Sequence, residues 1–338
     1  MPSTIIVDAM GGDNVPALPA ISSLEVCREN KDISILLVGY EKEIYEHIDR
    51  AEIPENLKVV NADREIGMGD APAKAFREKG DSSIHVAFDL LVSGEGDAFF
   101  SAGNTGAVVT AAYFKSGVIP DISRPALATS YPSFDNHKLI ILDLGATLDP
   151  KTENLVDFAV LGEAYKFFLS RNYGSRISIL NIGVEENKGN KRILEANEIL
   201  KKSPLNYTGY VEGNSLFSHP QTDVVVTDAF TGNVALKTIE GLTETISLMV
   251  KSNTFPHFKP VQNFVFNRVF GSVMHQFQYN LYGAAFLLGI NHLVGIGHGR
   301  SDKTAFKNAI LRLKRYSERG FVETFKNRVA EVKKEFGA

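Results

Sequence analysis

Residues 223–241, with the sequence DVVVTDAFTGNVALKTIEG, contain the features that decide the fold. The three valines at 224–226 form a β-branched run, which is typical of a strand buried on both faces of a parallel sheet. A polar turn over 228–233 follows, and good helix formers resume at Val234. A strand, a tight loop and a helix start in this order favour an anion site, because free backbone N–H groups and the positive end of the helix dipole face the loop.

The same pattern recurs along the chain. Other short apolar runs predict strands at 4–7, 33–38, 57–60, 97–100, 139–142, 177–181 and 293–296. Helical patterns separate most of these runs, which predicts an α/β fold with a mostly parallel sheet. Right-handed crossovers would place every strand's carboxyl end on one edge, where ligands bind. Polar side chains that follow the strands are therefore expected to converge there: Asp8, Asn104, Asp143, Lys188, Asp228, Asn233 and His298.

Composition narrows the possible functions. The chain has 338 residues, of which 44% are hydrophobic and 22% are charged, so it can form one large α/β domain or two smaller ones. A net charge of −4 argues against nucleic acid as a partner. Cys27 is the only cysteine, which excludes a disulfide framework, and it is predicted to be a core or half-buried residue. The start of the chain lacks a signal-peptide pattern and no apolar run reaches spanning length, which predicts a cytoplasmic protein.

Several common catalytic motifs are missing. GxxxxGK[ST], HExxH and GxSxG do not occur. Glycines at 295, 297 and 299 resemble a dinucleotide fingerprint only superficially, because Arg300 follows where the third fingerprint glycine would fall. No metal-ligand spacing stands out among the eight histidines. The sequence therefore predicts neither a metal nor a cofactor.

One aromatic-rich segment does not fit the βα pattern. Within 245–285, apolar residues recur with helical spacing at Phe266, Val269, Phe270, Val273, Met274 and Phe277. Such a helical excursion could pack in the core, against a second subunit, or in a membrane interface. The few Lys and Arg residues on its polar side weaken the membrane interpretation.

Taken together, seven short motifs resemble one family. They are VDAMGGD at 7–13, SAGNTGA at 101–107, RPAL at 124–127, KGN at 188–190, DVVVTD at 223–228, FTGNVALK at 230–237 and HGRS at 298–301. In order and spacing the chain resembles the PlsX family, the bacterial acyl-acyl carrier protein:phosphate acyltransferases. The resemblance covers residues 5 to about 310.

The resemblance implies a single catalytic domain over 1–338 with a three-layer α/β/α architecture. This fold is similar to phosphate acetyltransferases and to isocitrate/isopropylmalate dehydrogenases, and the assembly is usually a homodimer. The implied reaction moves a long fatty acyl group from acyl carrier protein to inorganic phosphate. Its product, acyl phosphate, feeds a glycerol-3-phosphate acyltransferase in phospholipid synthesis. The resemblance also implies peripheral membrane association, with the 245–285 excursion as a dimer or membrane contact.

Phosphate is its own nucleophile in this reaction, so the protein must supply positioning and charge stabilisation rather than a catalytic Ser or Cys. The resemblance places the matching lysine and asparagine, Lys188 and Asn233, at the phosphate site. Residues expected to complete the site are Gly189 and Asn190 beside Lys188, Thr231 and Gly232 with the backbone amides of 231–234, Asn104 and Thr105 for phosphate or oxyanion, and the paired glycines Gly11 and Gly12. Asp8 and Asp228 are expected to orient loops. His298 is either the acid that protonates the departing sulfur or a structural histidine.

The sequence departs from the family pattern at a few positions. Ala229 stands where glycine is usual, Thr147 where asparagine is usual, and Asn214–Ser215 where Arg-Asp is usual. The alternatives are therefore a short-chain acyltransferase that uses acyl-CoA, or a non-catalytic scaffold that binds acyl carrier protein or membrane. A basic cluster could dock acidic acyl carrier protein or could be a solvated helix face: Lys303, Lys307, Arg312, Lys314 and Arg315.

Overall fold

The computed structural model describes residues 2–133, 138–218, 222–252 and 283–337. Its centre is one eleven-stranded sheet with the strand order β3-β2-β1-β4-β11-β10-β5-β6-β9-β7-β8. The strands are β1 Ser3–Asp8, β2 Ile33–Gly39, β3 Leu57–Asn61, β4 Ala98–Ser101, β5 Ala126–Pro132, β6 Lys138–Leu142, β7 Ile177–Asn181, β8 Tyr207–Glu212, β9 Val224–Val226, β10 Ala285–Leu288 and β11 Leu293–Ile296.

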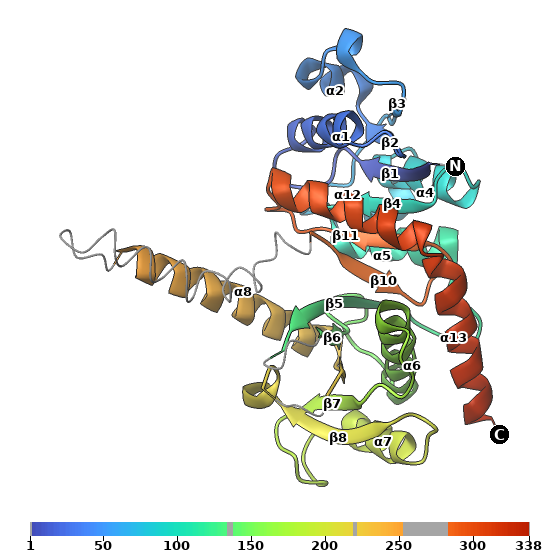
Figure 1. Cartoon of the computed structure of the whole chain (residues 1–338), viewed down its shortest axis with the longest axis vertical. Helices are drawn as coiled ribbons and strands as arrows, with labels where there is room; N and C mark the ends of the chain where they lie inside the picture. Colours follow the sequence, from blue (N-terminus) through green and yellow to red (C-terminus); the bar gives the residue numbers. More distant parts are fainter. Residues whose placement is uncertain (1, 134–137, 219–221, 253–282, 338) are drawn as a thin grey trace.

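Helices cover both faces of the sheet (Figure 1). Side chains of β1 alternate between two apolar cores: Ile5 and Val7 belong to one, and Ile6 belongs to the other. The first core packs against α1 Ala17–Glu29, α2 Glu41–His47, α6 Thr152–Ser170, α7 Lys191–Lys201, α12 Lys303–Glu318 and α13 Phe321–Phe336. The second packs against α3 Pro72–Glu78, α4 Ser83–Val92, α5 Thr105–Ala111 and the start of α8 Ala229–Ser252. The predicted three-layer α/β/α fold is confirmed.

Seven of the ten neighbouring strand pairs are parallel, as predicted. The pairs β10–β11, β10–β5 and β5–β6 are antiparallel. As a result, the block β3-β2-β1-β4-β11 and the block β6-β9-β7-β8 run in opposite directions along the sheet. The expectation that every carboxyl end lies on one edge is therefore wrong, and the candidate site residues form two groups, one for each block.

All eight strands expected from the sequence are present, and three further strands were missed. The missed strand β5 contains Ala, Ser, Thr and Pro, β8 is an edge strand interrupted by Gly209, and β10 has only four residues. The predicted turn over 228–233 is also wrong in part, because α8 already begins at Ala229. Cys27 is buried in α1, as predicted.

Helix α8 projects away from the sheet (Figure 1). Its first part packs on the second core through Leu236 and Ile239, whereas Leu242, Leu248 and Met249 are between 57% and 60% exposed. The aromatic stripe predicted over 266–277 lies outside the described residues. The assignment of 1–338 to a single domain stays a prediction.

A partly buried ion pair ties β9 to β7 just before both strands begin. The Arg176 guanidinium donates to both carboxylate oxygens of Asp223, at 2.8 and 3.0 Å, and the Arg176 amide donates to the same carboxylate. Burial alone would raise the pKa of Asp223, but the hydrogen bonds from Arg176 and the nearby Lys166 charge hold it at about 2. Burial lowers the pKa of Lys166, although the Asp223 carboxylate acts to raise it. Arg176 is therefore the main partner of Asp223.

Asp223→Asn is expected to destabilise the protein by about 2 kcal/mol at pH 7, since a pKa of about 2 instead of 3.8 favours the folded state by that amount. This stabilisation is present above pH 4 and is lost as the pH falls towards 2, so the two proteins should converge in acid. Urea unfolding between pH 3 and 7 measures the difference. Asp32→Asn is the control, because the Asp32 side chain, which pairs with Lys314, is 68% exposed. A constant difference across this pH range would contradict the assignment.

Candidate active site

The first group of site residues lies at the carboxyl ends of β1, β4 and β11. Asp8 is buried, and its carboxylate accepts a hydrogen bond from Ser101 Oγ at 2.7 Å and one from the Met10 amide at 3.0 Å. Burial raises the pKa of Asp8. The Asp13 amide donates to Gly299 O at 2.9 Å, which joins the β1 loop to the β11 loop. Asp8 thus holds loops together, as expected from the sequence.

Gly11 and Gly12 lie where these loops meet. A Cβ on Gly11 would stand 2.6 Å from Ser101 Oγ and 2.7 Å from the Gly103 amide nitrogen, so no side chain fits there. Gly12 has φ +126°, which favours glycine. The paired glycines therefore serve close packing of the β1 and β4 loops.

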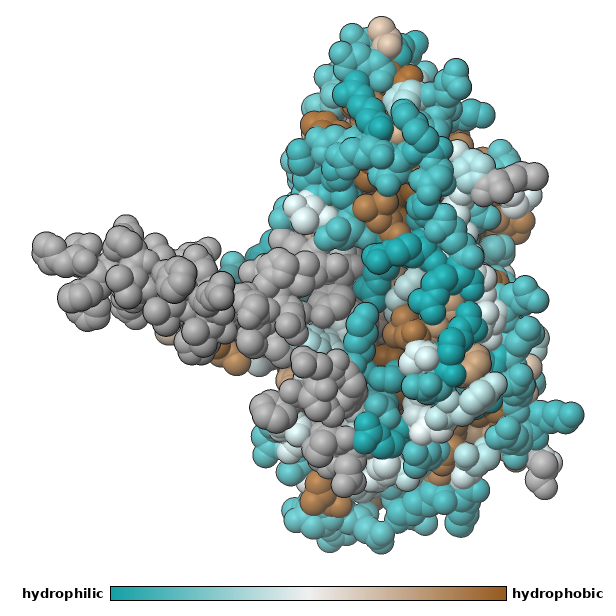
Figure 2. All heavy atoms as spheres, viewed as in Figure 1, coloured by the Kyte–Doolittle hydropathy of each residue, from teal (hydrophilic) through white to brown (hydrophobic). Residues whose placement is uncertain are grey.

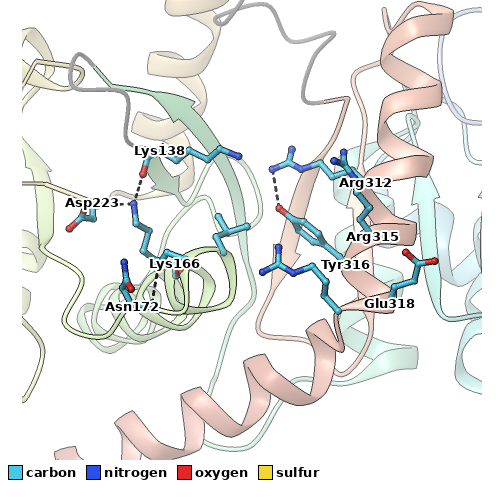
Figure 3. Close-up of a pocket in the computed structure, with 11 residues that line it drawn as sticks. Lys138, Lys166, Asn172, Asp223, Arg312, Arg315, Tyr316 and Glu318 are labelled. Atoms are coloured by element: carbon cyan, nitrogen blue, oxygen red, sulfur yellow. Dashed lines mark hydrogen bonds and ion pairs between the residues drawn. The ribbon is translucent and has the colours of Figure 1, made fainter.

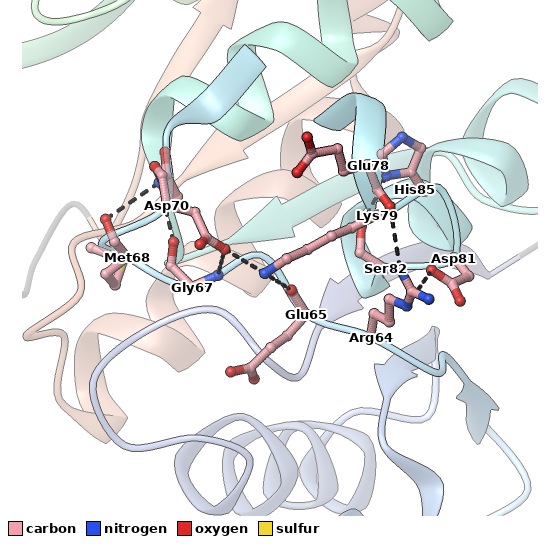
Figure 4. A network of polar contacts seen from close by, with 11 residues as sticks. Arg64, Glu65, Gly67, Met68, Asp70, Glu78, Lys79, Asp81, Ser82 and His85 are labelled. Carbon is pink, nitrogen blue, oxygen red and sulfur yellow. Dashed lines mark hydrogen bonds and ion pairs between the residues drawn. The ribbon is translucent and has the colours of Figure 1, made fainter. Parts of the chain in front are cut away.

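Asn104 caps α5 and binds a neighbouring loop with its whole amide group. Its Oδ1 accepts from the Ala107 amide at 3.1 Å, and its Nδ2 faces the carbonyls of Gly67, Met68 and Asp70 at 3.0–3.3 Å. Lys79 braces that loop by donating to Asp70 Oδ2 at 2.6 Å and to Glu65 O (Figure 4). Since both amide hydrogens face carbonyl groups, Asn104 is placed as a structural residue; Thr105, the first residue of α5, lies beside it.

The second group surrounds the start of α8. The Asp228 carboxylate accepts from the Thr231 amide at 2.8 Å and from Thr231 Oγ1 at 2.9 Å, so Asp228 caps the helix. The Gly232 amide donates to Asp228 O, as in an ordinary first turn. The amides of Thr231 and Gly232 therefore have partners within the protein, and the expectation that the 231–234 amides are free for phosphate is wrong.

Gly232 fixes the position of α8 against the loop after β6. A Cβ on Gly232 would lie 2.0 Å from Asp143 O. The loop is itself held by Asp143, whose carboxylate accepts hydrogen bonds from the backbone amides of Leu127, Gly145, Ala146 and Thr147. The Ala229 amide donates to Thr147 O.

The departures from the family pattern at positions 147 and 229 fit this packing. Among the described residues, positive φ angles of non-glycine residues occur at Asp121 and Arg171, so Ala229 adopts no conformation that demands glycine. Thr147 Oγ1 donates to Pro125 O at 3.1 Å. Both residues therefore take part in the packing of these loops.

A cavity of about 720 Å³ opens beside the second group. Asn190 caps α7 and lines the cavity with Gly189, Asp228 and Thr231. Leu180, Ile182, Ile193, Val234 and Ala235 supply apolar wall, and Asn214 lines it as well. Lys188 is exposed and does not line this cavity; its carbonyl accepts from Asn181 Nδ2 at 3.0 Å. The cavity thus combines polar groups with an apolar wall.

Lys237 joins the two groups of residues. It lies on α8, and its Nζ is 2.5 Å from Nε2 of His298 in the β11 loop and 2.8 Å from Glu240 Oε2. A second contact along the same seam pairs Arg300 with Glu244 at 3.8 Å. Lys237 is eight residues into α8, about 12 Å along its axis, so the helix spans the distance between the two blocks.

Asn233 lies one helical turn before Lys237, so both side chains occupy the same side of α8. Of the three predicted catalytic residues, His298 makes this contact with Lys237, and Asn233 lies on the same side of α8. Lys237 itself was not predicted as a site residue. The only signal for it was its place at the end of the 230–237 motif.

Both ring nitrogens of His298 face N–H donors. The Arg300 amide donates to Nδ1 at 3.1 Å, and the Lys237 ammonium faces Nε2. Burial lowers the pKa of His298; the charges of Lys237 and Arg300 lower it further, while Glu240 and Asp13 oppose this effect. An imidazolium could accept from neither donor, and a neutral ring accepts from one of them, here the Arg300 amide at Nδ1. The ring is therefore held neutral near pH 7, which argues against His298 as the acid that protonates a departing sulfur.

The predicted basic docking cluster is largely neutralised within the chain. Lys303 pairs with Glu25, Lys307 with Glu25 and Glu29, and Lys314 with Asp32 and Glu318, all at 2.7–3.3 Å. Arg312 is buried, so Arg315 is the member that is exposed without an ion pair among the described residues. The ion pairs favour the alternative of a solvated helix face, and docking of acyl carrier protein on this cluster stays a prediction.

The described surface seen in Figure 2 is mainly hydrophilic, with small apolar patches between polar ones. Within the described ranges, no helix is both long and apolar enough to cross a bilayer. In the same residues, no group of three or more His, Cys, Asp or Glu side chains is arranged to hold a metal ion.

Comparisons with known proteins agree with this geometry. Residues 3–324 match the family model described as "Fatty acid synthesis protein". The chain is 38% identical to the phosphate acyltransferase of Desulfitobacterium hafniense (strain DSM 10664 / DCB-2), covering 95% of this chain and 96% of that protein. It is 39% identical to the phosphate acyltransferase of Geobacter sulfurreducens, covering 94% and 91%.

A solved phosphotransacetylase from Streptococcus pyogenes shares the fold. It has a TM-score of 0.60 and 16% identity, and 94% of each chain is covered. The expected similarity to phosphate acetyltransferases is therefore confirmed for the fold. The family match and the identity to curated relatives over almost the whole chain show that the chain is an acyltransferase enzyme and belongs to the phosphate acyltransferase family.

Proposed function

We propose that this enzyme transfers a long-chain fatty acyl group from acyl carrier protein to inorganic phosphate, giving acyl phosphate for phospholipid synthesis. The observation that supports it most is the seam where Lys237 meets His298, with Asn233 one helical turn earlier on the same side of α8. A cavity with a mixed polar and apolar wall lies along another side of the start of this helix. Such a site offers a cation for phosphate and apolar surface for the thioester. Membership of the phosphate acyltransferase family supports the same reaction.

In the proposed reaction a phosphate oxygen attacks the thioester carbonyl carbon, the new C–O bond forms, and the C–S bond breaks. Phosphate is already largely dianionic near neutral pH, by analogy with the second pKa of about 6 of phosphomonoesters. The thiol that leaves has a pKa of about 8.5, so the thiolate departs without obligatory protonation. The chain therefore has to position phosphate and stabilise developing negative charge.

Three groups are proposed to hold phosphate: the Lys188 ammonium, the Lys237 ammonium and the Asn233 amide. An ammonium has three N–H donors, of which Glu240 takes one and His298 at most one, so Lys237 keeps at least one for a phosphate oxygen. Its side chain is 47% exposed and therefore accessible to a substrate. The thioester is proposed to lie in the cavity beside the start of α8, where Asn214 would contribute to donor preference.

The proposed partners follow from the acyl donor and the exposed part of α8. Acyl carrier protein delivers the acyl group, and a glycerol-3-phosphate acyltransferase consumes the product. The chain is proposed to form a homodimer in the cytoplasm and to associate peripherally with the membrane. Exposed Leu242, Leu248 and Met249 on α8 support a contact that continues into the 245–285 segment.

Thiol release from palmitoyl-acyl carrier protein, with and without phosphate, tests the proposal. Palmitoyl-CoA and acetyl-CoA serve as competing donors. Phosphate-dependent release that is fastest with the carrier-protein substrate is the expected result. Faster release from acetyl-CoA would favour a short-chain enzyme, and no phosphate dependence with any donor would overturn the proposed reaction.

Lys188→Ala is expected to raise the phosphate KM at least about tenfold or to lower kcat similarly, because it removes a charge proposed to bind a dianion. Its side chain is exposed, so the melting temperature should not change. Lys191→Ala is the matched control: it removes a lysine three residues away whose side chain is 88% exposed. Kinetics of Lys188→Ala equal to those of the control would remove Lys188 from the site.

His298→Gln is expected to lower kcat less than about tenfold and to leave the shape of its pH profile unchanged. A neutral ring that accepts hydrogen bonds acts by positioning, whereas a general acid contributes about 10²–10⁴-fold. Steady-state rates with saturating phosphate and thioester between pH 5.5 and 9 measure both quantities. A loss of about 10³-fold together with loss of the basic limb would identify His298 as the acid instead.

A further inference from the structure

A second cavity, of about 580 Å³, lies at the opposite edge of the β6–β9 block (Figure 3). Lys138 and Asp223 line it, and these residues stand at the amino ends of β6 and β9. Asp143 and Asp228 of the candidate active site follow the carboxyl ends of the same strands. The cavity is therefore separate from the candidate active site.

Positively charged side chains line this cavity on two opposite sides. Lys138 and Lys166 come from β6 and α6, while Arg312, Arg315 and Arg319 come from the end of α12 and the residue that caps it (Figure 3). Five cations thus line the cavity against two carboxylates, Asp223 and Glu318. Leu169 and the ring of Tyr316 add apolar wall.

Both carboxylates are already engaged by cations. Asp223 is bound by Arg176, and Glu318 pairs with Lys314 at 2.7 Å. In the part of the chain that the structure describes, neither Lys138 nor Arg315 has a carboxylate within ion-pair distance, and Arg319 donates to Phe168 O at 2.9 Å. The positive charge of the cavity is therefore not cancelled by its own acidic residues.

The negative ends of the neighbouring helix dipoles do not cancel the positive charge of the cavity either. Helices α6 and α12 both end at the cavity, and each C-terminus carries the equivalent of about half a negative charge. Together they offset about one of the three positive charges in excess. Like charges that face each other across a gap raise the free energy of the folded protein, and a polyanion between them would lower it.

We propose that this cavity binds a small soluble molecule that carries at least two phosphate charges, of the size of a nucleoside diphosphate. Guanidinium groups such as those of Arg315 and Arg319 match phosphate oxygens in pairs. The volume exceeds that of a single phosphate, and Leu169 with the Tyr316 ring can contact an organic part. The site is independent of the proposed acyl transfer and would survive its failure.

Isothermal titration of the whole chain with pyrophosphate and with ADP tests the site. One saturable site per chain that persists in Lys237→Met is expected, with binding at that site weakened at least about tenfold in Arg315→Gln/Arg319→Gln and in Lys138→Gln. Lys138 is exposed and lies on the other wall of the cavity. Its variant therefore tests the site independently if the arginine double variant misfolds. Lys307→Gln, which removes a paired lysine of the same helix, and Lys237→Met, at the candidate active site, should bind as tightly as the wild type.

The proposal would be overturned by three results. These are no saturable binding of either probe to the wild type, equal binding by the wild type and the folded cavity variants, or weakening by Lys237→Met alone. Binding of the protein to anionic lipid vesicles is measured as a further test. Binding to vesicles without binding to soluble pyrophosphate or ADP would overturn the assignment to a soluble ligand.

Discussion

Gly232→Ala is expected to destabilise the protein by about 3 kcal/mol and to lower kcat/KM at least about 100-fold. The added methyl group would lie 2.0 Å from Asp143 O and 2.9 Å from Thr227 Cγ2. A backbone carbonyl cannot turn away as a flexible side chain can, and this one belongs to a loop held by four backbone hydrogen bonds to the Asp143 carboxylate. The start of α8 must therefore move, and Asn233 and Lys237 would move with it.

Gly241→Ala is the matched control for this substitution. Gly241 lies on the same helix, and a Cβ there would meet no atom within 4 Å. Alanine has a higher helix propensity than glycine, so this variant should be more stable by up to about 1 kcal/mol and fully active. Denaturant unfolding and phosphate-dependent thiol release measure both variants. A Gly232→Ala protein as stable and active as Gly241→Ala would show that the α8 start tolerates displacement.

The sequence predicted the strands that follow simple physical rules. β1, β2, β7 and β9 are rich in Val and Ile and buried on both faces, so short apolar runs identify them. β5 and β10 carry the reversal of direction in the sheet, but their composition is that of ordinary loops and core segments. Without them the sequence could not show that the candidate residues form two groups instead of one.

The sequence could indicate which glycines pack closely, but not which polar groups have hydrogen-bond partners in the folded chain. Close contacts at Gly11 and Gly232 leave a signature in sequence, because only glycine fits there. Whether the Asn104 amide or the Thr231 amide is available to a ligand depends on partners brought in by folding, such as the loop at 67–70. The Lys237–His298 contact joins residues 61 positions apart, so no local spacing indicates it.

Lys237→Met is expected to lower kcat/KM for phosphate about 100-fold, which corresponds to about 2.7 kcal/mol of lost charge stabilisation. The side chain is one atom shorter and loses its charge, while the KM for the thioester should change little. Lys237 is held by Glu240 and His298 with an N–H left over, so its ammonium is pre-positioned for an anion. Initial rates over a range of phosphate concentrations at fixed acyl donor separate the two KM values.

Two variants distinguish a direct contact with phosphate from a merely structural role. Glu240→Gln loosens the ammonium without removing it, so its phosphate KM should lie between those of the wild type and Lys237→Met. Lys307→Met removes another lysine that pairs with glutamates, and it should leave the kinetics unchanged. If Lys237→Met were folded and lost rate equally at low and saturating phosphate, the ammonium would act on the transition state of acyl transfer. If its kinetics matched Lys307→Met, the seam between α8 and the β11 loop would bind no anion, and Lys188 with Asn190 would be left to hold phosphate at the mouth of the cavity.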